Sequence, residues 1–404
     1  MKKILLSVFA FIISFNVFSQ NDEDRWVDSV FNSLTLEQQV GQLMNLRANQ
    51  PNKDFDTKIA EYIDNYNIGG VTFFRTDAEL LLQQTNEWQA MAQTPLMIAI
   101  DGEWGLGMRI NDGLSYPYQM TLGAITNDSL ISEMGRQIAE QCVRIGINVN
   151  FAPDIDVNNE PNNPVIGFRS FGEDPDNVAR KGAAYALALQ NNGVLPSMKH
   201  FPGHGNTKTD SHHALPVIKN SLEEIEKIEL APFKYLIDKG VKGAMVGHLY
   251  FPALEPVVNK SSSLSKNIVT DLLKNKMNYD GIIFTDGLEM KGAYNGIHQD
   301  SVCLHALMAG NDIMILPINA ENSINIIIEA AKNDALVRNR VEESCKKVLR
   351  HKYQLGLNDY QYQSVERLDN DLKQNRYFVL KQRLYNEAVT MLVNKKDILP
   401  LKKG

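Results

Sequence analysis

Residues 281–287 read GIIFTDG, an apolar run that ends on a carboxylate at Asp286. Similar runs recur along the chain, each rich in apolar residues and without strict alternation of polar and apolar positions. This pattern is typical of strands that are buried on both faces. The other runs are VGQLMNL (40–46), GGVTFF (69–74), LMIAID (96–101), INVNFAPDID (147–156), LPSMKHF (195–201), KGAMVGHL (242–249) and DIMILP (312–317).

Helical patterns lie between these runs. Ser221 with Glu224 three residues later predicts a capping box, and Asp174-Pro175 predicts the start of another helix. Strands that alternate with helices in this way favour an α/β protein with a closed (β/α)8 TIM-like barrel, and a doubly wound open sheet is the alternative. The helical patterns cover residues 77–92, 128–145, 175–191, 221–238 and 299–309.

The ends of the chain differ in character from the middle. Lys2 and Lys3 precede the apolar run ILLSVFAFIISFNVF, with small residues at the −3 and −1 positions before Gln20. This layout predicts a signal peptide over 1–19 and a secreted or periplasmic mature chain with no stable membrane insertion, and a retained membrane anchor is the alternative. After residue 320 we expect two helices over 321–355 and a long polar helix over 366–390, as a C-terminal helical extension.

The composition excludes several classes of protein. The 404 residues are 44% hydrophobic, which argues against a disordered, collagen-like or membrane-bundle chain. The net charge of −7 argues against a nucleic-acid partner, because such a partner needs a basic face. Cys142, Cys303 and Cys345 are widely spaced and form neither a disulfide framework nor a zinc pattern, so we expect them to be small buried hydrophobic residues.

Residues 199–213 read KHFPGHGNTKTDSHH and hold half of the eight histidines. A metal site is one interpretation, but Pro202 and the two glycines here disfavour the helix that would bring His200 and His204 onto one face. A mobile loop with a proton-transfer pair is the better interpretation. Asp210 and His212 are two apart, which puts both side chains on one side of an extended segment. A solvated Asp-Ser turn is the alternative.

Three more segments carry polar residues beside apolar runs. In IIFTDGLEM (282–290), Asp286 is either a carboxylate nucleophile or a helix cap paired with Glu289. In AIDGEWGLGMRI (99–110), the Asp101 carboxylate can accept hydrogen bonds from sugar hydroxyls, and Trp104 offers a stacking face. In NNPVIGFRSFGEDP (162–175), the loop holds Arg169.

In this order, these motifs resemble glycoside hydrolase family 3, in its β-N-acetylglucosaminidase branch, over about residues 30–355. The most specific segments are KHFPGHG followed by TDSHHALP, and FTDGLEM. The resemblance implies that Asp286 is the nucleophile and that His212 is the general acid/base, assisted by Asp210. It also implies that the terminal sugar is held by Asp101, Arg109, Arg169, Lys199 and His200.

The resemblance implies a retaining exo-β-N-acetylglucosaminidase. Its substrate would be an oligosaccharide containing N-acetylglucosamine, from peptidoglycan or chitin, and no metal or organic cofactor is implied. The alternatives are a β-glucosidase-like member of the family with its acid on a second domain, and a catalytically inactive carbohydrate-binding barrel.

Two features bear on how the chain departs from other family members. The usual glycine and arginine of the Asp101 segment are here Trp104 and Leu106, at the outer subsite. AVTMLVNKKDILPLK resembles the opening of the α/β sandwich domain that follows the barrel in longer members. We therefore expect a barrel domain over 20–360, and over 361–404 a helical linker with the start of a second domain that is absent here.

Overall fold

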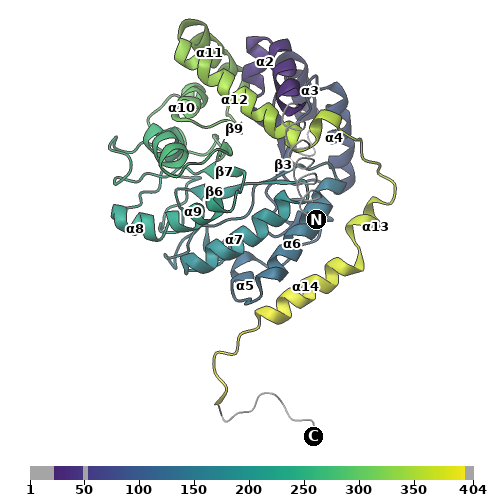
Figure 1. The fold of residues 1–404 in the computed structure, drawn as a ribbon, viewed down its shortest axis with the longest axis vertical. Helices are drawn as coiled ribbons and strands as arrows, with labels where there is room; N and C mark the ends of the chain where they lie inside the picture. Colours follow the sequence, from purple (N-terminus) through teal and green to yellow (C-terminus); the bar gives the residue numbers. More distant parts are fainter. Residues whose placement is uncertain (1–21, 49–52, 396–404) are drawn as a thin grey trace, which may run out of the picture.

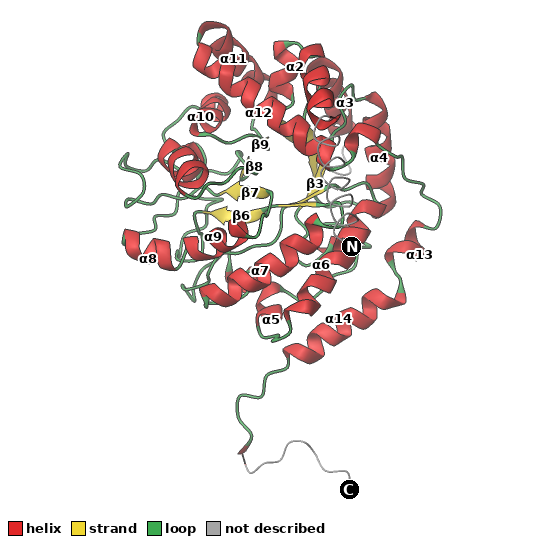
Figure 2. Ribbon diagram, viewed as in Figure 1, coloured by secondary structure: helices red, strands yellow, loops and turns green. Residues whose placement is uncertain are grey.

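The computed structural model describes residues 22–48 and 53–395, so the expected signal peptide lies outside the described residues. Short strands lie at the centre of the molecule and helices surround them (Figure 1 and Figure 2). All the strand pairs are parallel. The described chain is therefore an α/β fold built on parallel strands, as expected from the alternation of apolar and helical runs.

The strands form a curled parallel sheet. Their order is β5-β4-β3-β2-β1-β9 in one sheet and β6-β7-β8 in the other. Isolated parallel bridges from Asp154 to Lys199 and from Phe284 to Ile313 connect the two sheets. The strands are β1 (Met44–Ala48), β2 (Gly70–Phe73), β3 (Met97–Ile100), β4 (Val149–Asn150), β5 (Leu195–Pro196), β6 (Met198–Phe201), β7 (Gly243–Val246), β8 (Ile282–Thr285) and β9 (Met314–Ile315).

Helices follow the strands and cover the outside of the sheet (Figure 2). The predicted caps are present: the Ser221 hydroxyl accepts a hydrogen bond from the Glu224 backbone N–H, and Asp174 caps a helix that begins with Pro175. The longer helices are α3 (Lys53–Tyr66), α4 (Ala78–Met91), α6 (Asp128–Arg144), α7 (Pro175–Gln190), α9 (Leu230–Asp238), the π-helix η4 (Asn267–Lys276), α10 (Val302–Ala309), α11 (Ala320–Asn333), α12 (Ala335–Gln354) and α14 (Asn375–Ala388). The shorter ones are α2 (Leu36–Gly41), α5 (Gln119–Gly123), α8 (Leu222–Lys227) and α13 (Leu368–Leu372).

Several predicted boundaries are wrong. The run 40–46 begins inside α2, because Thr35 and Gln38 form a capping box that draws Val40 into a helix. The single helix predicted over 221–238 is divided into α8 and α9. Pro232 has no N–H to donate to residue 228, which favours a break there.

The region after residue 355 also differs from the prediction. The expected helix over 366–390 is divided into α13 and α14, and residues 389–394 have no regular secondary structure. Leu380 and Leu384 of α14 are buried, and α14 lies against α5 and α6 (Figure 1). The tail leaves the molecule beyond α14, with Leu392 88% exposed.

The core explains why the apolar runs lack alternation. Every residue of β2, β3, β7 and β8 is buried, because helices cover one face of these strands and side chains fill the space enclosed by the curled sheet on the other. The three cysteines are free and buried, as predicted. Within the described residues, no helix is long and apolar enough to cross a membrane.

Candidate active site

A cavity of about 220 Å³ lies at the carboxyl ends of the strands, where parallel α/β folds build their sites. The structure brings almost every predicted site residue to this cavity. Asp210 does not line it and instead contacts His212, which does. The predicted residues that line the cavity are Asp101, Arg109, Arg169, Lys199, His200, His212 and Asp286.

Asp286 directly follows β8 and points into this cavity. Its backbone N–H donates to the Val246 carbonyl of the neighbouring strand, and its Oδ1 accepts a hydrogen bond from the Gly287 N–H at 2.8 Å. Burial alone would raise the pKa of this carboxyl. The groups around the carboxyl, among them the Gly287 N–H and the Lys199 ammonium, outweigh the burial, so the pKa lies below its ordinary value. Asp286 is therefore ionised at neutral pH.

The alternative interpretation of Asp286 as a helix cap is wrong. Residues 286–290 form turns, and the next α-helix, α10, begins at Val302. Glu289 instead forms an ion pair with Arg47 of β1. The carboxylate at position 286 is thus held in the cavity without a capping role.

His212 and Asp210 form the predicted pair. The His212 ring Nδ1 lies 2.7 Å from Asp210 Oδ1, and the same oxygen accepts the His212 backbone N–H at 2.8 Å. These bonds lower the pKa of Asp210 despite its partial burial. An ionised Asp210 fixes the proton of His212 on Nδ1, which leaves Nε2 free to exchange a proton with a ligand. The His212 side chain is 59% exposed, so solvent reaches it.

Ser211, which lies between Asp210 and His212, anchors the loop that carries this pair. Ser211 is buried, and its hydroxyl lies 2.9 Å from Nε2 of the buried His204. The Ser211 carbonyl accepts the Gly292 N–H from the loop that follows Asp286. Burial lowers the pKa of His204 to about 4, so this ring is neutral and acts as a support.

Gly203 and Gly205, near the start of this loop, are closely approached by other groups. Gly203 has a φ of +132°, and a Cβ there would lie 2.7 Å from the Glu229 Cβ. A Cβ on Gly205 would lie 1.7 Å from the Val157 carbonyl oxygen. Both glycines are required because other groups approach them closely.

The residues predicted to hold the sugar form one network of ion pairs. Lys199 Nζ donates to Asp101 Oδ1 at 2.9 Å, and Arg109 Nη2 donates to Asp101 Oδ2 at 2.7 Å. Burial would raise the pKa of Asp101, but the two cations outweigh it and hold this pKa far below its ordinary value. Asp101 is therefore a fixed carboxylate acceptor at the cavity wall.

Sequence reasoning missed Glu103, which is completely buried at the centre of this network. Its carboxylate accepts hydrogen bonds from Arg169 Nη2 at 2.7 Å and from Arg169 Nε at 3.0 and 3.2 Å, and it pairs with Lys199 at 2.8 Å. Burial works against ionisation, yet Arg169 and Lys199 lower the pKa of Glu103 to about 2. The sequence feature that could have identified Glu103 is its position two residues after Asp101, just beyond the end of β3.

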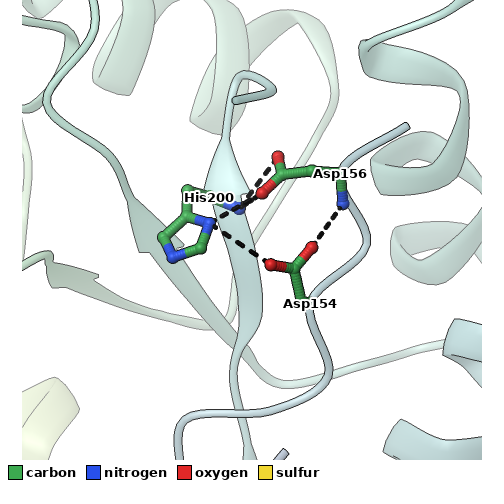
Figure 3. A group of neighbouring side chains, drawn as sticks. All are labelled: Asp154, Asp156 and His200. Carbon is green, nitrogen blue, oxygen red and sulfur yellow. Dashed lines mark hydrogen bonds and ion pairs between the residues drawn. The ribbon is translucent and has the colours of Figure 1, made fainter. Parts of the chain in front are cut away.

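Asp156 orients His200, as Figure 3 shows. Its Oδ2 lies 2.7 Å from His200 Nδ1, and its carboxylate also accepts the backbone N–H groups of His200 and His204. On the other side of the ring, Nε2 lies 3.3 Å from Arg169 Nη2, which can only donate. His200 therefore carries its proton on Nδ1 and presents Nε2 as an acceptor.

Asp154 lies beside Asp156 and His200 and, unlike Asp156, it is the carboxyl that keeps its proton. Its Oδ1 accepts the Asp156 backbone N–H at 3.0 Å, and its buried Oδ2 accepts no hydrogen bond but lies 3.9 Å from His200 Nδ1 (Figure 3) and 3.6 Å from Arg169 Nη2. Burial and the neighbouring Asp156 carboxylate raise the pKa of Asp154. Asp156 accepts several N–H groups and stays ionised, so Asp154 is the carboxyl that keeps a proton.

Asp154, Asp156 and His200 could offer three ligand atoms within 4.8 Å of one another to a metal ion. In the arrangement described above, His200 Nδ1 carries a proton and donates it to Asp156, so this nitrogen has no free lone pair. The Asp156 carboxylate is thus engaged as a hydrogen-bonded support for His200. The predicted lack of a metal or cofactor stays a prediction.

His248 also supports the active site, although the sequence motifs did not single it out as a site residue. It is buried, and burial lowers its pKa, so the ring is neutral. Nε2 lies 3.0 Å from the Gly287 carbonyl oxygen and Nδ1 lies 2.8 Å from the Ser263 hydroxyl. The ring thereby fixes the backbone directly after Asp286.

Comparisons with known proteins identify the family of the chain. Residues 35–351 match the family model for the glycosyl hydrolase family 3 N-terminal domain. The chain is 36% identical over 292 residues to beta-hexosaminidase A of Pseudoalteromonas piscicida, covering 67% of this chain and 49% of that protein. It is 34% identical over 259 residues to a beta-hexosaminidase of Nitrosomonas eutropha, covering 62% of this chain and 73% of that protein.

A solved structure supports the same assignment. A glycoside hydrolase family 3 beta-N-acetylglucosaminidase from Paenibacillus superposes with a TM-score of 0.83 at 32% identity, over 88% of this chain and 69% of that one. The matched region thus spans about half of the Pseudoalteromonas relative and about two thirds of the Paenibacillus structure. Since the family model covers most of the chain, the chain belongs to glycosyl hydrolase family 3.

Proposed function

We propose that this protein is a retaining exo-β-N-acetylglucosaminidase. The observation that carries the proposal is the shared cavity, in which the ionised Asp286 and the His212–Asp210 pair face the same space. The relatives named beta-hexosaminidase and beta-N-acetylglucosaminidase support this choice of sugar.

In the proposed first step, the Asp286 carboxylate attacks the anomeric carbon and forms a covalent glycosyl-enzyme. The glycosidic bond breaks, and the leaving oxygen takes a proton from His212 Nε2. In the second step, His212 takes a proton from water, the water oxygen attacks the anomeric carbon, and the bond to Asp286 breaks. Two displacements return the original configuration at that carbon. Asp210 stabilises His212 while the ring is charged.

Fixed polar groups would hold the terminal sugar. Asp101 offers carboxylate oxygens to its hydroxyls, and Lys199 and Arg169 offer donors. His200 offers Nε2 as an acceptor, because Asp156 holds its proton on Nδ1. A cavity of about 220 Å³ is smaller than the ~300–1,000 Å³ of typical ligand sites, which suits a single sugar and therefore cleavage at chain ends.

Three finer proposals accompany this function. The curled sheet is a closed barrel of eight strand–helix units, supported by the bridges that connect its two sheets. The segment 1–19 directs the protein out of the cytoplasm, where peptidoglycan fragments or chitin-derived oligosaccharides are the substrates. Residues 361–404 link the barrel domain to further sequence, supported by the exposed tail beyond α14.

Hydrolysis of an aryl β-N-acetylglucosaminide should be compared with that of the matching aryl β-glucoside. We expect the first to be cleaved much faster, with the β-anomer as the first product in an NMR time course. A preference for the glucoside would favour the β-glucosidase-like alternative. Binding without turnover would favour an inactive barrel.

A further inference from the structure

A second cavity, of about 470 Å³, lies at the opposite end of the sheet from the active site. It is lined by Lys242 and Asp280, which come just before β7 and β8. The active-site cavity is instead lined by Met245 within β7 and by Asp286 directly after β8. The later turns of α12 and the end of η4 form the other walls of the second cavity. We call this space the basal cavity.

Cations outnumber carboxylates around the basal cavity. The lining carboxylates are Asp280 and Glu343, whose side chains are 85% and 62% exposed, so water screens their charges. The lining therefore carries an excess of positive charge, which favours an anion. The lining cations are Lys242, Lys274, Lys347 and Arg350.

Lys274 is a largely buried cation that lacks a hydrogen-bond acceptor. Its side chain is 16% exposed, and its ammonium lies 3.7 Å from Glu343 and 3.9 Å from Asp312, without a hydrogen bond to any described residue. Asp312 is already shared with Arg340 at 2.7 Å and Lys347 at 3.0 Å. Burial lowers the pKa of Lys274, and the charge of Asp312 does not offset it. An acceptor brought by a ligand would therefore stabilise this ammonium.

His351, one helical turn after Lys347, is a second polar group without a partner. It is 6% exposed and lines the cavity, and its ring makes no hydrogen bond with any described residue. Burial lowers its pKa to about 4, so the ring is neutral and has one N–H to donate. Buried polar side chains are nearly always paired in proteins. A ligand with oxygen acceptors would satisfy both His351 and Lys274.

The type of cation indicates the type of anion. Lys242, Lys274 and Lys347 reach the cavity from three different elements: the segment before β7, η4 and α12. Ammonium groups act as point charges, which suits the oxygens of a tetrahedral phosphate that point in several directions. A planar carboxylate is matched better by the fork of an arginine.

The arginine of the lining is already engaged. Arg350 donates to Glu23 at 2.9 Å and to Asp24 at 2.8 Å, and neither carboxylate lines the cavity. The volume of about 470 Å³ falls within the ~300–1,000 Å³ of small-molecule sites, so the cavity has room for more than a phosphate group alone. We propose that the basal cavity binds a phosphate group, carried by a small molecule or free in solution, on its three lysines.

The test measures binding by isothermal titration calorimetry and by melting temperature, at pH 8 and at an ionic strength held constant with sodium chloride. Inorganic phosphate, phenyl phosphate and citrate are titrated separately. We expect saturable binding of both phosphates, with a rise in melting temperature that follows the affinity. Tighter binding of phenyl phosphate would indicate an organic ligand, and equal binding would indicate free phosphate. Citrate that binds more tightly than both would overturn the choice of phosphate.

Lys274→Met removes the ammonium and keeps most of the apolar stem, while Asp312 retains Arg340 and Lys347 as partners. We expect this variant to bind inorganic phosphate about tenfold more weakly, or worse. Lys266→Met is the matched control. It removes the same charge directly before η4, but the Lys266 side chain is 64% exposed and does not line the cavity. Its affinity should stay within about twofold of the unmodified protein.

Lys242→Met provides a second test if Lys274→Met folds poorly, because the Lys242 side chain is 42% exposed and its loss disturbs the fold less. Unchanged affinity in both variants would place the phosphate elsewhere, for example beside Lys199 and Arg169 in the active-site cavity, and would overturn the proposal. So would the absence of saturable binding to the unmodified protein. Binding is measured without a glycoside, so its outcome is independent of the proposed function.

Discussion

At the scale of single residues, the site depends on neighbouring carboxyl groups that hold different protonation states. Asp156 accepts three N–H groups and is ionised, whereas Asp154 accepts one and keeps its proton. Glu103 is as deeply buried as either, and it is ionised because it pairs with two cations. Burial disfavours ionisation of all three carboxyls, so the charges and hydrogen bonds around each one decide which of them ionise.

Asp154 gives a pH dependence of stability that can be measured. In the unfolded chain it loses its proton near pH 4, but in the folded protein its pKa is raised. Above pH 4 the unfolded state therefore binds fewer protons, and the free energy of unfolding falls as the pH rises toward the raised pKa. Asp154→Asn removes this titration. In urea unfolding, the free energy of unfolding of the variant should rise relative to that of the unmodified protein by about 1.4 kcal/mol per pH unit across this window. The difference should then level off above the raised pKa.

Asp280→Asn provides the control for this measurement, because the Asp280 side chain is 85% exposed and its ion-pair partner is the ammonium of Lys242. Its unfolding free energy should run parallel to that of the unmodified protein across the same pH range. A parallel curve for Asp154→Asn as well would mean that Asp154 is ionised in the folded state.

Asp286→Asn tests the nucleophile. The amide cannot form the glycosyl-enzyme, so turnover should fall by several orders of magnitude, roughly 10³-fold or more. The melting temperature should change little, since among the described residues this side chain makes one hydrogen bond, with the Gly287 N–H. A 2-fluoro sugar should label Asp286 in the unmodified protein, as peptide mass spectrometry would show. A label on another residue would contradict the assignment.

At the scale of elements, the loop that carries Asp210 and His212 determines how the acid meets the nucleophile. Ser211 anchors this loop to His204 at its base and to Gly292 beyond β8. The anchored residue is buried, while the residues on either side of it face solvent or the cavity. Ser211 thus positions the proton-transfer pair, although its own side chain takes no part in proton transfer.

His212→Ala should separate good leaving groups from poor ones. A poor leaving group needs a proton to depart and a good one does not, so the alkyl or sugar glycoside should slow far more than a dinitrophenyl glycoside, by about 10²–10⁴-fold. Asp210→Ala should act in the same direction through the same step. The double variant should be little worse than the worse single one, because the pair acts as a unit. Equal slowing of both substrates would make His212 a binding residue.

At the scale of the whole molecule, the sequence predicts the residues at strand ends well and the buried partners poorly. Asp286 and His212 lie in short local motifs that are visible without a structure. Glu103 is bound to Arg169, which lies 66 positions away, and only the curled sheet brings them together. The boundary errors have a similar origin, because capping at Thr35 and the missing N–H of Pro232 outweigh apolar periodicity.

The tail beyond α14 should be dispensable for stability, and α14 should not be. Val389 and Leu392 are 81% and 88% exposed, so a chain that ends at Ala388 should keep its melting temperature. A chain that ends at Leu372 loses the buried Leu380 and Leu384, each worth about 1.5–3 kcal/mol. Calorimetry of the two shortened chains checks this, and equal melting temperatures would show that α14 is only loosely docked.

Because all three cysteines are buried, the protein should react slowly with thiol reagents. Burial raises the pKa of each thiol to about 12, so little reactive thiolate forms near neutral pH. A fluorescent maleimide would therefore react almost entirely with a cysteine introduced on the surface, without prior removal of the native ones. His213 is 81% exposed beside the proton-transfer pair, and a dye attached to His213→Cys would test whether this loop moves when substrate binds.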